Sequence, residues 1–163
     1  MQARWIIIDG YSLIHRRGRP GERPGNLMAA RQRLIRNLEE VAGSLAERIT
    51  VVFDGIGSPK PKGQAGGEGY ESSVVEVLFS PSDKTADTLI ERMVHEAPSS
   101  TGIMVVTSDR LERETTGAAG ADTMSCGEFA AWCEQTQGEL SRQAGGRYQK
   151  NSGSMLGDYF PKR

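Results

Sequence analysis

The alternation of short apolar runs with helical patterns is the feature that most constrains this fold. Trp5-Ile6-Ile7-Ile8 and Ile103-Met104-Val105-Val106 are continuously apolar, which is typical of strands that are covered on both faces. In all, β-rich runs occupy residues 4–8, 49–53, 73–79, 103–107 and, more weakly, 121–124. Because helical periodicity separates several of these runs, the sequence predicts a three-layer α/β fold with a mostly parallel five-stranded sheet.

Three segments between or after the strands show the spacing of amphipathic helices. The first begins at residue 27, with Asn26 as a candidate N-cap, and the second covers residues 85–95 and ends before Pro98. Ser125 and Glu128 have the spacing of a capping box, so a third helix is expected from residue 126. The apolar positions that carry the periodicity are Leu34, Ile35, Leu38, Val41, Leu45, Leu89, Ile90, Met93, Val94, Phe129, Trp132 and Cys133.

The length of 163 residues suits one domain of ordinary size. Residues 55–70 are rich in Gly and Pro, and a loop of this length in a compact domain is usually functional or disordered. From residue 142 onward the apolar periodicity is lost, and five basic residues stand against one acidic residue. We therefore predict a domain over residues 1–142, followed by a flexible basic tail over residues 143–163.

Several functional classes are excluded by what the sequence lacks. No apolar run approaches the ~20 residues that span a bilayer, and the first apolar run stops at Asp9, so neither membrane insertion nor export is expected. Cys126 and Cys133 lie ~10 Å apart along one predicted helix, too far for a disulfide, which favours buried thiols in a reducing cytoplasm. Glycine signatures of dinucleotide sites, P-loops and α/β-hydrolases are also missing.

Aspartates follow the predicted strands at the points where these strands end. Asp9, Asp54 and Asp109 each follow a strand, and Asp87 lies in the first turn of a predicted helix. The carboxyl ends of parallel strands share one sheet edge, so these side chains are expected to converge there. Converging carboxylates repel one another unless a hard cation such as Mg²⁺ or Mn²⁺ binds them. Glu91, one helical turn after Asp87, can reach the same edge. The alternative is that each aspartate is an ordinary turn or cap residue.

Basic charge gathers near the same edge. Residues 15–36 contain seven arginines and one glutamate, although the whole chain has a net charge of −1. Arg16, Arg17 and Arg19 follow the first strand closely and are candidates for binding the phosphates of a polyanion, while Tyr11 can stack on unpaired bases. Arg31 is expected on a solvated helix face. The same interpretation holds for Arg33, and His15 and His95 are expected to be surface residues.

Together these motifs resemble the YacP-like NYN family of PIN-related endoribonucleases. The resemblance covers residues 4–135 and is carried by Ile-Ile-Asp9-Gly-Tyr-Ser, Val-Val-Phe-Asp54-Gly, Thr-Ala-Asp87-Thr-Leu-Ile-Glu91 and Thr-Ser-Asp109-Arg. It implies a Rossmann-like sheet of order 3-2-1-4-5, an acidic pocket that holds Mg²⁺ or Mn²⁺, and endonucleolytic cleavage of RNA. Some relatives act on ribosome-associated mRNA.

The resemblance also implies roles for individual residues. Asp9, Asp87 and Asp109 match the acidic positions that hold the metal and catalyse cleavage. One departure is Ser12, which stands where the family usually has Asn; a serine can still donate a hydrogen bond to a carboxylate, phosphate or water. The supporting residues would be Asp54, Ser12, Ser108 and Glu91, and the RNA-binding residues Arg16, Arg17, Arg19, Arg110 and Tyr11.

The sequence therefore predicts a cytoplasmic, divalent-metal-dependent endoribonuclease that acts on single-stranded RNA or ribosome-bound mRNA. The main alternative is a PIN-like module that binds RNA or the ribosome without catalysis, because a fold alone does not fix a chemistry. A weaker alternative is a nuclease that acts on DNA or on a flap structure.

Overall fold

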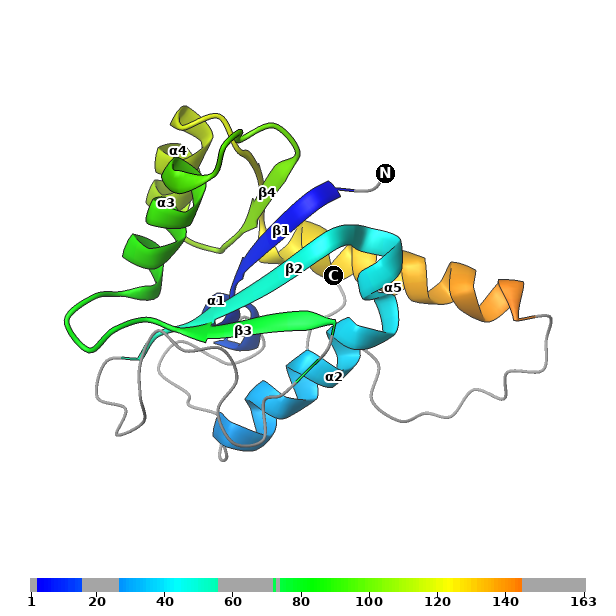
Figure 1. The fold of residues 1–163 in the computed structure, drawn as a ribbon. Coiled ribbons are helices and arrows are strands. Elements are labelled where there is room, and N and C mark those ends of the chain that lie inside the picture. Colours follow the sequence, from blue (N-terminus) through cyan, green and yellow to red (C-terminus); the bar gives the residue numbers. More distant parts are fainter. Residues whose placement is uncertain (1–2, 16–26, 56–71, 73, 145–163) are drawn as a thin grey trace.

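The computed structural model describes residues 3–15, 27–55, 72 and 74–144, and five strands within them form one sheet. All four neighbouring strand pairs are parallel, and the order is β3-β2-β1-β4-β5 (Figure 1). These findings confirm the predicted α/β class and strand order. The strands are β1 Ala3–Asp9, β2 Ala46–Phe53, β3 Val75–Phe79, β4 Ile103–Val106 and β5 Asp122–Met124.

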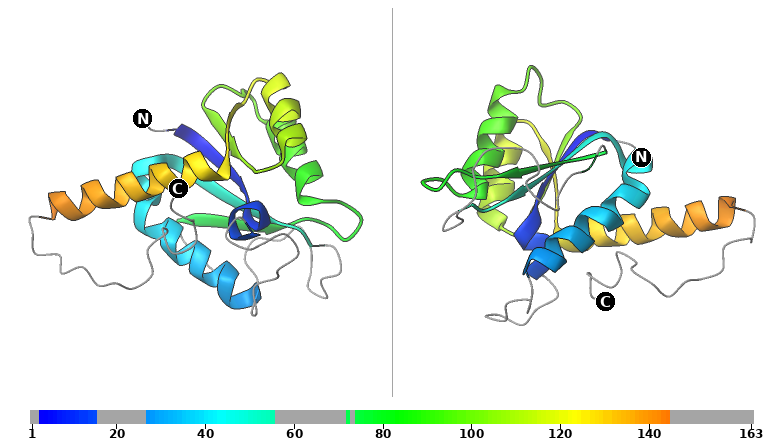
Figure 2. Two further views of the ribbon diagram at one scale, coloured as in Figure 1. Left: turned by 180° about the vertical axis from the view of Figure 1, so that it is seen from behind. Right: turned by 60° about the horizontal axis from the view of Figure 1, so that its bottom comes forward.

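Helices cover both faces of the sheet, as the buried strands require. On one face α2 packs against α5, and on the other α3 packs against α4, which gives three layers (Figure 2). The short helix α1 contacts β1, β2 and α2. The helices are α1 Gly10–His15, α2 Leu27–Leu45, α3 Ala86–Glu96, α4 Arg110–Ala118 and α5 Cys126–Gln143.

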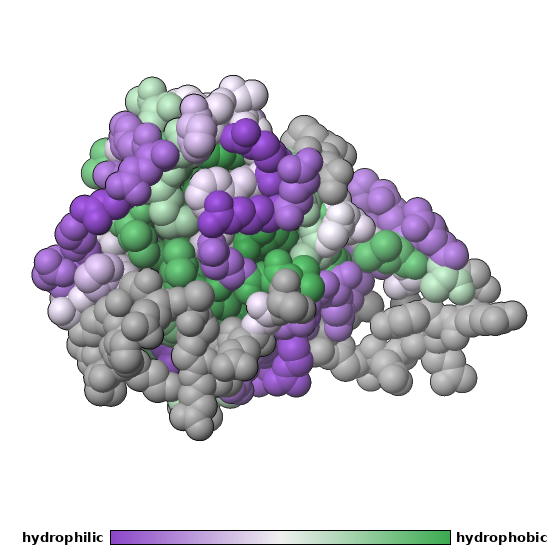
Figure 3. Space-filling view, in the orientation of Figure 1, coloured by the Kyte–Doolittle hydropathy of each residue, from purple (hydrophilic) through white to green (hydrophobic). Residues whose placement is uncertain are grey.

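The structure of strand β1 explains the unbroken apolar run of residues 5–8. Ile6 and Ile8 point into the larger hydrophobic core, on the side of α2 and α5, whereas Ile7 points into the smaller core on the side of α3. All three side chains are fully buried, so the middle of the strand has no position for a polar residue; the exposed Arg4 lies near its start. Figure 3 shows the side of the smaller core, where hydrophobic residues gather over the sheet with hydrophilic residues around them.

The predicted helix starts agree with the observed caps where the structure describes them. The Thr85 hydroxyl accepts a hydrogen bond from the Thr88 amide at 3.3 Å, and the Ser125 hydroxyl accepts one from the Glu128 amide at 3.2 Å. Asn26 lies outside the described residues. The two cysteines are buried free thiols, as their spacing predicted.

Helices α1 and α4 were not predicted. The buried residues of α4 are Glu112 and Thr116, so this helix packs through polar side chains and shows no apolar periodicity. Asp109 is its N-cap, and the carboxylate accepts hydrogen bonds from the amides of Leu111 at 2.9 Å and Glu112 at 3.4 Å.

The predicted boundary after residue 142 falls in the last turn of α5, and residues 145–163 of the predicted tail lie outside the described part of the chain. The same is true of residues 56–70 in the predicted Gly/Pro-rich loop. Within the described residues, no helix combines the length and the hydropathy needed to cross a bilayer.

Candidate active site

Three carboxylates from three different elements meet at the carboxyl edge of the sheet. Asp9 is the last residue of β1, Asp87 lies in the first turn of α3, and Glu112 lies in the first turn of α4. One oxygen atom from each lies within 4.8 Å of the others, and Asp9 and Glu112 are buried while Asp87 is half-buried. The fold therefore brings together two of the predicted aspartates and one glutamate that the sequence analysis did not select.

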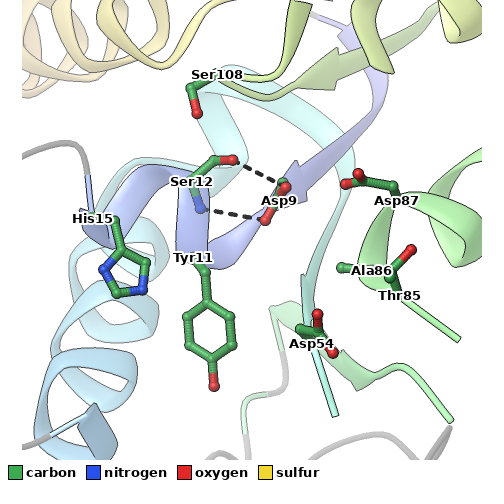
Figure 4. Close-up of a pocket in the computed structure, with 9 residues that line it drawn as sticks. All are labelled: Asp9, Tyr11, Ser12, His15, Asp54, Thr85, Ala86, Asp87 and Ser108. Atoms are coloured by element: carbon green, nitrogen blue, oxygen red, sulfur yellow. Dashed lines mark hydrogen bonds between the residues drawn. The ribbon is translucent and has the colours of Figure 1, made fainter. Parts of the chain in front are cut away.

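Hydroxyl groups hold two of these carboxylates in place. The Ser12 amide donates to Oδ1 of Asp9 at 3.3 Å, and the Ser12 hydroxyl donates to Oδ2 at 3.0 Å (Figure 4). Thr107, which follows β4, donates its hydroxyl proton to Oε2 of Glu112 at 2.8 Å. The hydroxyl oxygens of Ser12 and Thr107 are 3.5 Å apart, so the groups that hold Asp9 and Glu112 lie next to each other. Ser12 thus donates to a carboxylate, as the sequence allowed.

The surroundings of the acidic cluster raise the pKa values of two of its members, Asp9 and Glu112. Burial raises the pKa of Asp9, the hydrogen bonds from Ser12 partly offset this effect, and the charge of Asp87 adds to it. Burial also raises the pKa of Glu112, to about 9, with further contributions from the nearby carboxyl groups of Asp87 and Asp9. Oε1 of Glu112 is buried and has no hydrogen-bond partner among the described residues. Such an oxygen suits a cation that is held between the three carboxylates.

A pocket of about 460 Å³ opens beside the cluster (Figure 4). Asp54, at the end of β2, and Ser108, between β4 and α4, both line this pocket, so the fold places two predicted supporting residues here. Glu91 is half-buried on α3 and belongs neither to the pocket nor to the cluster. The lining residues are Asp9, Tyr11, Ser12, His15, Asp54, Thr85, Ala86, Asp87 and Ser108.

Asp109 has a different place from the one expected. Its side chain is exposed and caps α4, and it does not belong to the group of carboxylates within 4.8 Å. Glu112, three residues later, belongs to that group instead. An N-cap aspartate followed three residues later by glutamate is itself a helix-start pattern, so this signal could have placed Glu112 in a first helical turn at the sheet edge.

The predicted RNA-binding residues are only partly described. Arg110 is exposed at the start of α4 and forms an exposed ion pair with Glu114 at 3.4 Å. Arg16, Arg17 and Arg19 lie outside the described residues. Tyr11 is half-buried and lines the pocket.

On helix α2, one residue differs from its predicted environment. Arg31 was expected on a solvated face of α2, but its side chain is half-buried, donates a hydrogen bond to Tyr11, and lies near the Phe53 ring. Arg33, on the same helix, is exposed as expected.

The parallel sheet of order 3-2-1-4-5, with an acidic pocket at its carboxyl edge, defines a protein of the PIN-like α/β class. A family model of the YacP-like NYN domain matches residues 6–162, and the chain belongs to that family. Domains of this family are PIN-like nuclease domains.

Two solved structures support this assignment at the level of the fold. The chain is similar to Rae1 (YacP) from Bacillus subtilis, with 26% identity and a TM-score of 0.66 over 85% of this chain and 78% of that one. A Rae1 mutant with one tryptophan changed to leucine gives 24% identity and a TM-score of 0.65, over 95% and 88% of the two chains. No curated protein sequence matches the chain.

Proposed function

We propose that this protein is a divalent-metal-dependent endoribonuclease that hydrolyses phosphodiester bonds of RNA. The observation that carries the proposal is the meeting of Asp9, Asp87 and Glu112 at a pocket, with one buried carboxylate oxygen that has no protein partner in the described structure. Membership of a family of PIN-like nuclease domains supports the choice of nucleic acid as substrate.

The donor set fits Mg²⁺ or Mn²⁺. Both ions prefer carboxylate and water oxygens, and oxygens on opposite sides of an octahedral Mg²⁺ ion lie ~4.2 Å apart. The three carboxylates offer one oxygen each within 4.8 Å, close to that spacing. Asp9, Asp87 and Glu112 would therefore hold the ion. A bound divalent ion would supply an activated water and stabilise negative charge on the phosphate oxygens.

The other residues of the site orient these ligands and contact the substrate. Ser12 fixes both oxygens of Asp9, and Thr107 fixes one oxygen of Glu112, so the carboxylates keep their orientation before an ion arrives. Asp109 acts indirectly, because its carboxylate caps α4 and so fixes the backbone from which Glu112 projects. Ser108 offers a hydroxyl at the pocket wall. Arg110, which follows the cap, would contact a flanking phosphate of the substrate.

RNA as the substrate class is supported by the family and is compatible with the lining of the pocket. A pocket of about 460 Å³ has the size of sites that accept a small organic group, and here one wall is acidic while Tyr11 adds an aromatic ring. Arg16, Arg17 and Arg19 would add phosphate contacts and increase the salt dependence of binding. Ribosome-bound mRNA as the natural substrate and a cytoplasmic location are predictions that rest on the family resemblance.

The decisive experiment is cleavage of a circular single-stranded RNA, which has no end for an exonuclease to attack. We expect the purified protein to open it with Mg²⁺ or Mn²⁺ and to stop when EDTA is added. Asp87→Asn should abolish cleavage, whereas Glu96→Gln, an exposed change on the same helix, should not. Circular dichroism of both variants confirms that they are folded.

Each alternative predicts a different result in the same assay. Binding of RNA that persists in EDTA, without cleavage under any metal condition, would identify a non-catalytic RNA-binding module. Faster cleavage of circular DNA of the same sequence would identify a deoxyribonuclease. Either result would overturn the proposal.

A further inference from the structure

Arg31 lies behind the wall of the pocket, in contact with aromatic rings. Its Nη1 donates a hydrogen bond of 2.6 Å to the hydroxyl of Tyr11. Its guanidinium carbon is 5.8 Å from the ring centre of Phe53 and 5.5 Å from that of Phe79. Phe53 is fully buried and Phe79 almost so, which means that the charged group of Arg31 borders the apolar core.

A guanidinium loses hydration when it borders buried rings, so an apolar side chain would pack at this position at a lower cost. An apolar side chain, however, has no directional donor. One donor of Arg31 reaches the hydroxyl of Tyr11, and the Tyr11 ring packs at 50° against Phe53 with the ring centres 5.2 Å apart. The ring of Tyr11 is therefore held at its hydroxyl end, along its face, and by the backbone of α1.

The held ring lies next to the acidic cluster. Tyr11 comes two residues after Asp9 in the sequence, and both side chains line the same pocket. In Figure 4 the ring extends away from the carboxylate of Asp9, with His15 on one side and Asp54 on the other. The ring of His15 is 5.7 Å from that of Tyr11. The Tyr11 ring and the carboxylates of Asp9 and Asp87 thus line the same pocket.

We propose that Arg31 is a positioning residue that holds the Tyr11 ring as a stacking wall for one unpaired base of the substrate RNA. This inference rests on the proposed function, and it adds Arg31, a residue that the sequence did not indicate, as the support of a ring already expected to stack on unpaired bases. Stacking tolerates any base, because every base has a π-face, but it needs a base that is free of its duplex partner. The site would therefore choose single-stranded segments without reading their sequence.

The test uses binding, measured by fluorescence anisotropy of a short labelled single-stranded RNA in EDTA, so that no RNA is cut. In a series of such RNAs, one nucleotide at a time is replaced by an abasic one. We expect the wild-type affinity to fall roughly tenfold when the abasic nucleotide occupies the position whose base would stack on Tyr11. Arg31→Met should bind the intact RNA roughly tenfold more weakly and should show no further loss at that position.

The matched control is Arg36→Met, which removes the same charge from an exposed position of the same helix. It should keep the abasic penalty at full size, because a charge effect alone acts equally on all RNAs of the series. Tyr11→Phe keeps the ring but removes the acceptor of Arg31, so it should also reduce the penalty, and it provides the same test if Arg31→Met does not fold.

The outcomes separate this inference from the proposed function. A wild-type protein with no abasic penalty at any position, or an Arg31→Met variant that keeps the penalty, overturns the role of Arg31 even if the protein cleaves RNA. A wild-type protein with the penalty that never cleaves RNA with Mg²⁺ or Mn²⁺ supports the stacking wall and overturns the nuclease.

Discussion

The two walls of the pocket are built on opposite principles. The acidic wall consists of Asp9 and Asp87, which line the pocket, together with Glu112 beside them; it brings three carboxyl groups close together and leaves one buried oxygen without a partner among the described residues. The aromatic wall consists of Tyr11, which lines the pocket, with Phe53, Phe79 and Arg31 behind it, and its rings pack against one another and against a hydrogen-bonded cation. The acidic wall is incomplete without a ligand, whereas the aromatic wall is an extension of the hydrophobic core to the surface.

The largest effect is expected for a ligand of the acidic wall. Glu112→Gln removes a charge that the ion needs, and we expect RNA cleavage to fall by more than about 100-fold, since even outer-shell partners of metal ligands are worth roughly 10–100-fold. Initial rates at saturating Mg²⁺ measure the loss. Glu114→Gln, an exposed change on the same helix, is the control. Equal rates for Glu112→Gln and the wild type would remove Glu112 from the metal site.

The aromatic wall should respond in stability, because its packing leaves no room beside Gly10. A Cβ atom at Gly10 would stand 2.3 Å and 2.6 Å from two ring carbons of Phe53, which is fully buried and cannot easily move. Gly10→Ala should lower the free energy of unfolding by about 1–3 kcal/mol, measured by urea denaturation. Gly43→Ala meets nothing within 4 Å and should not destabilise, so equal curves for the two variants would contradict the packing account.

The free energy of unfolding should also depend on pH, through Glu112 of the acidic wall. The pKa of Glu112 is about 9 in the folded state against an ordinary value of 4.5, so the folded state holds a proton that the unfolded state releases. The free energy of unfolding of the metal-free protein should therefore fall as the pH rises from about 4.5 to about 9. Glu112→Gln should flatten this fall and stabilise the metal-free protein at pH 8. A steeper fall in the variant would contradict this origin.

The smallest effect on activity is expected at Asp109. Asparagine caps helices about as well as aspartate, so Asp109→Asn should keep both the fold and cleavage within a few-fold of the wild type. Asp109→Ala loses the cap and should lower the free energy of unfolding by roughly 1 kcal/mol. A collapse of activity in Asp109→Asn, matching that of Asp87→Asn, would return Asp109 to the set of metal ligands.

The architecture could be predicted from the sequence because buried parallel strands are continuous apolar runs that are easy to recognise. Strand β1 is apolar on both faces, and its neighbour β4 repeats this pattern, so their positions and the α/β class could be read directly. The edge of the sheet then placed Asp9 and Asp87 near each other, because strand ends and the following helix starts share that edge.

The sequence did not predict the third carboxylate or the support of the aromatic wall, and the physical reasons differ. Glu112 lies on a helix whose buried face is polar, so the periodicity that reveals most helices was missing there. Arg31 looks like an ordinary basic residue of an amphipathic helix, and only the tertiary packing shows that its guanidinium reaches Tyr11. Long side chains that border a core while their charged ends reach a polar partner are ambiguous in sequence.

The three residues of the acidic wall are far apart along the chain. They arrive on β1, α3 and α4, so a chain that ends before Glu112 lacks part of the centre however well its first strands have formed. If the proposed function holds, fragments and unfinished polypeptides that end before Glu112 should therefore leave RNA uncut. Catalytic competence would require synthesis past the first turn of α4.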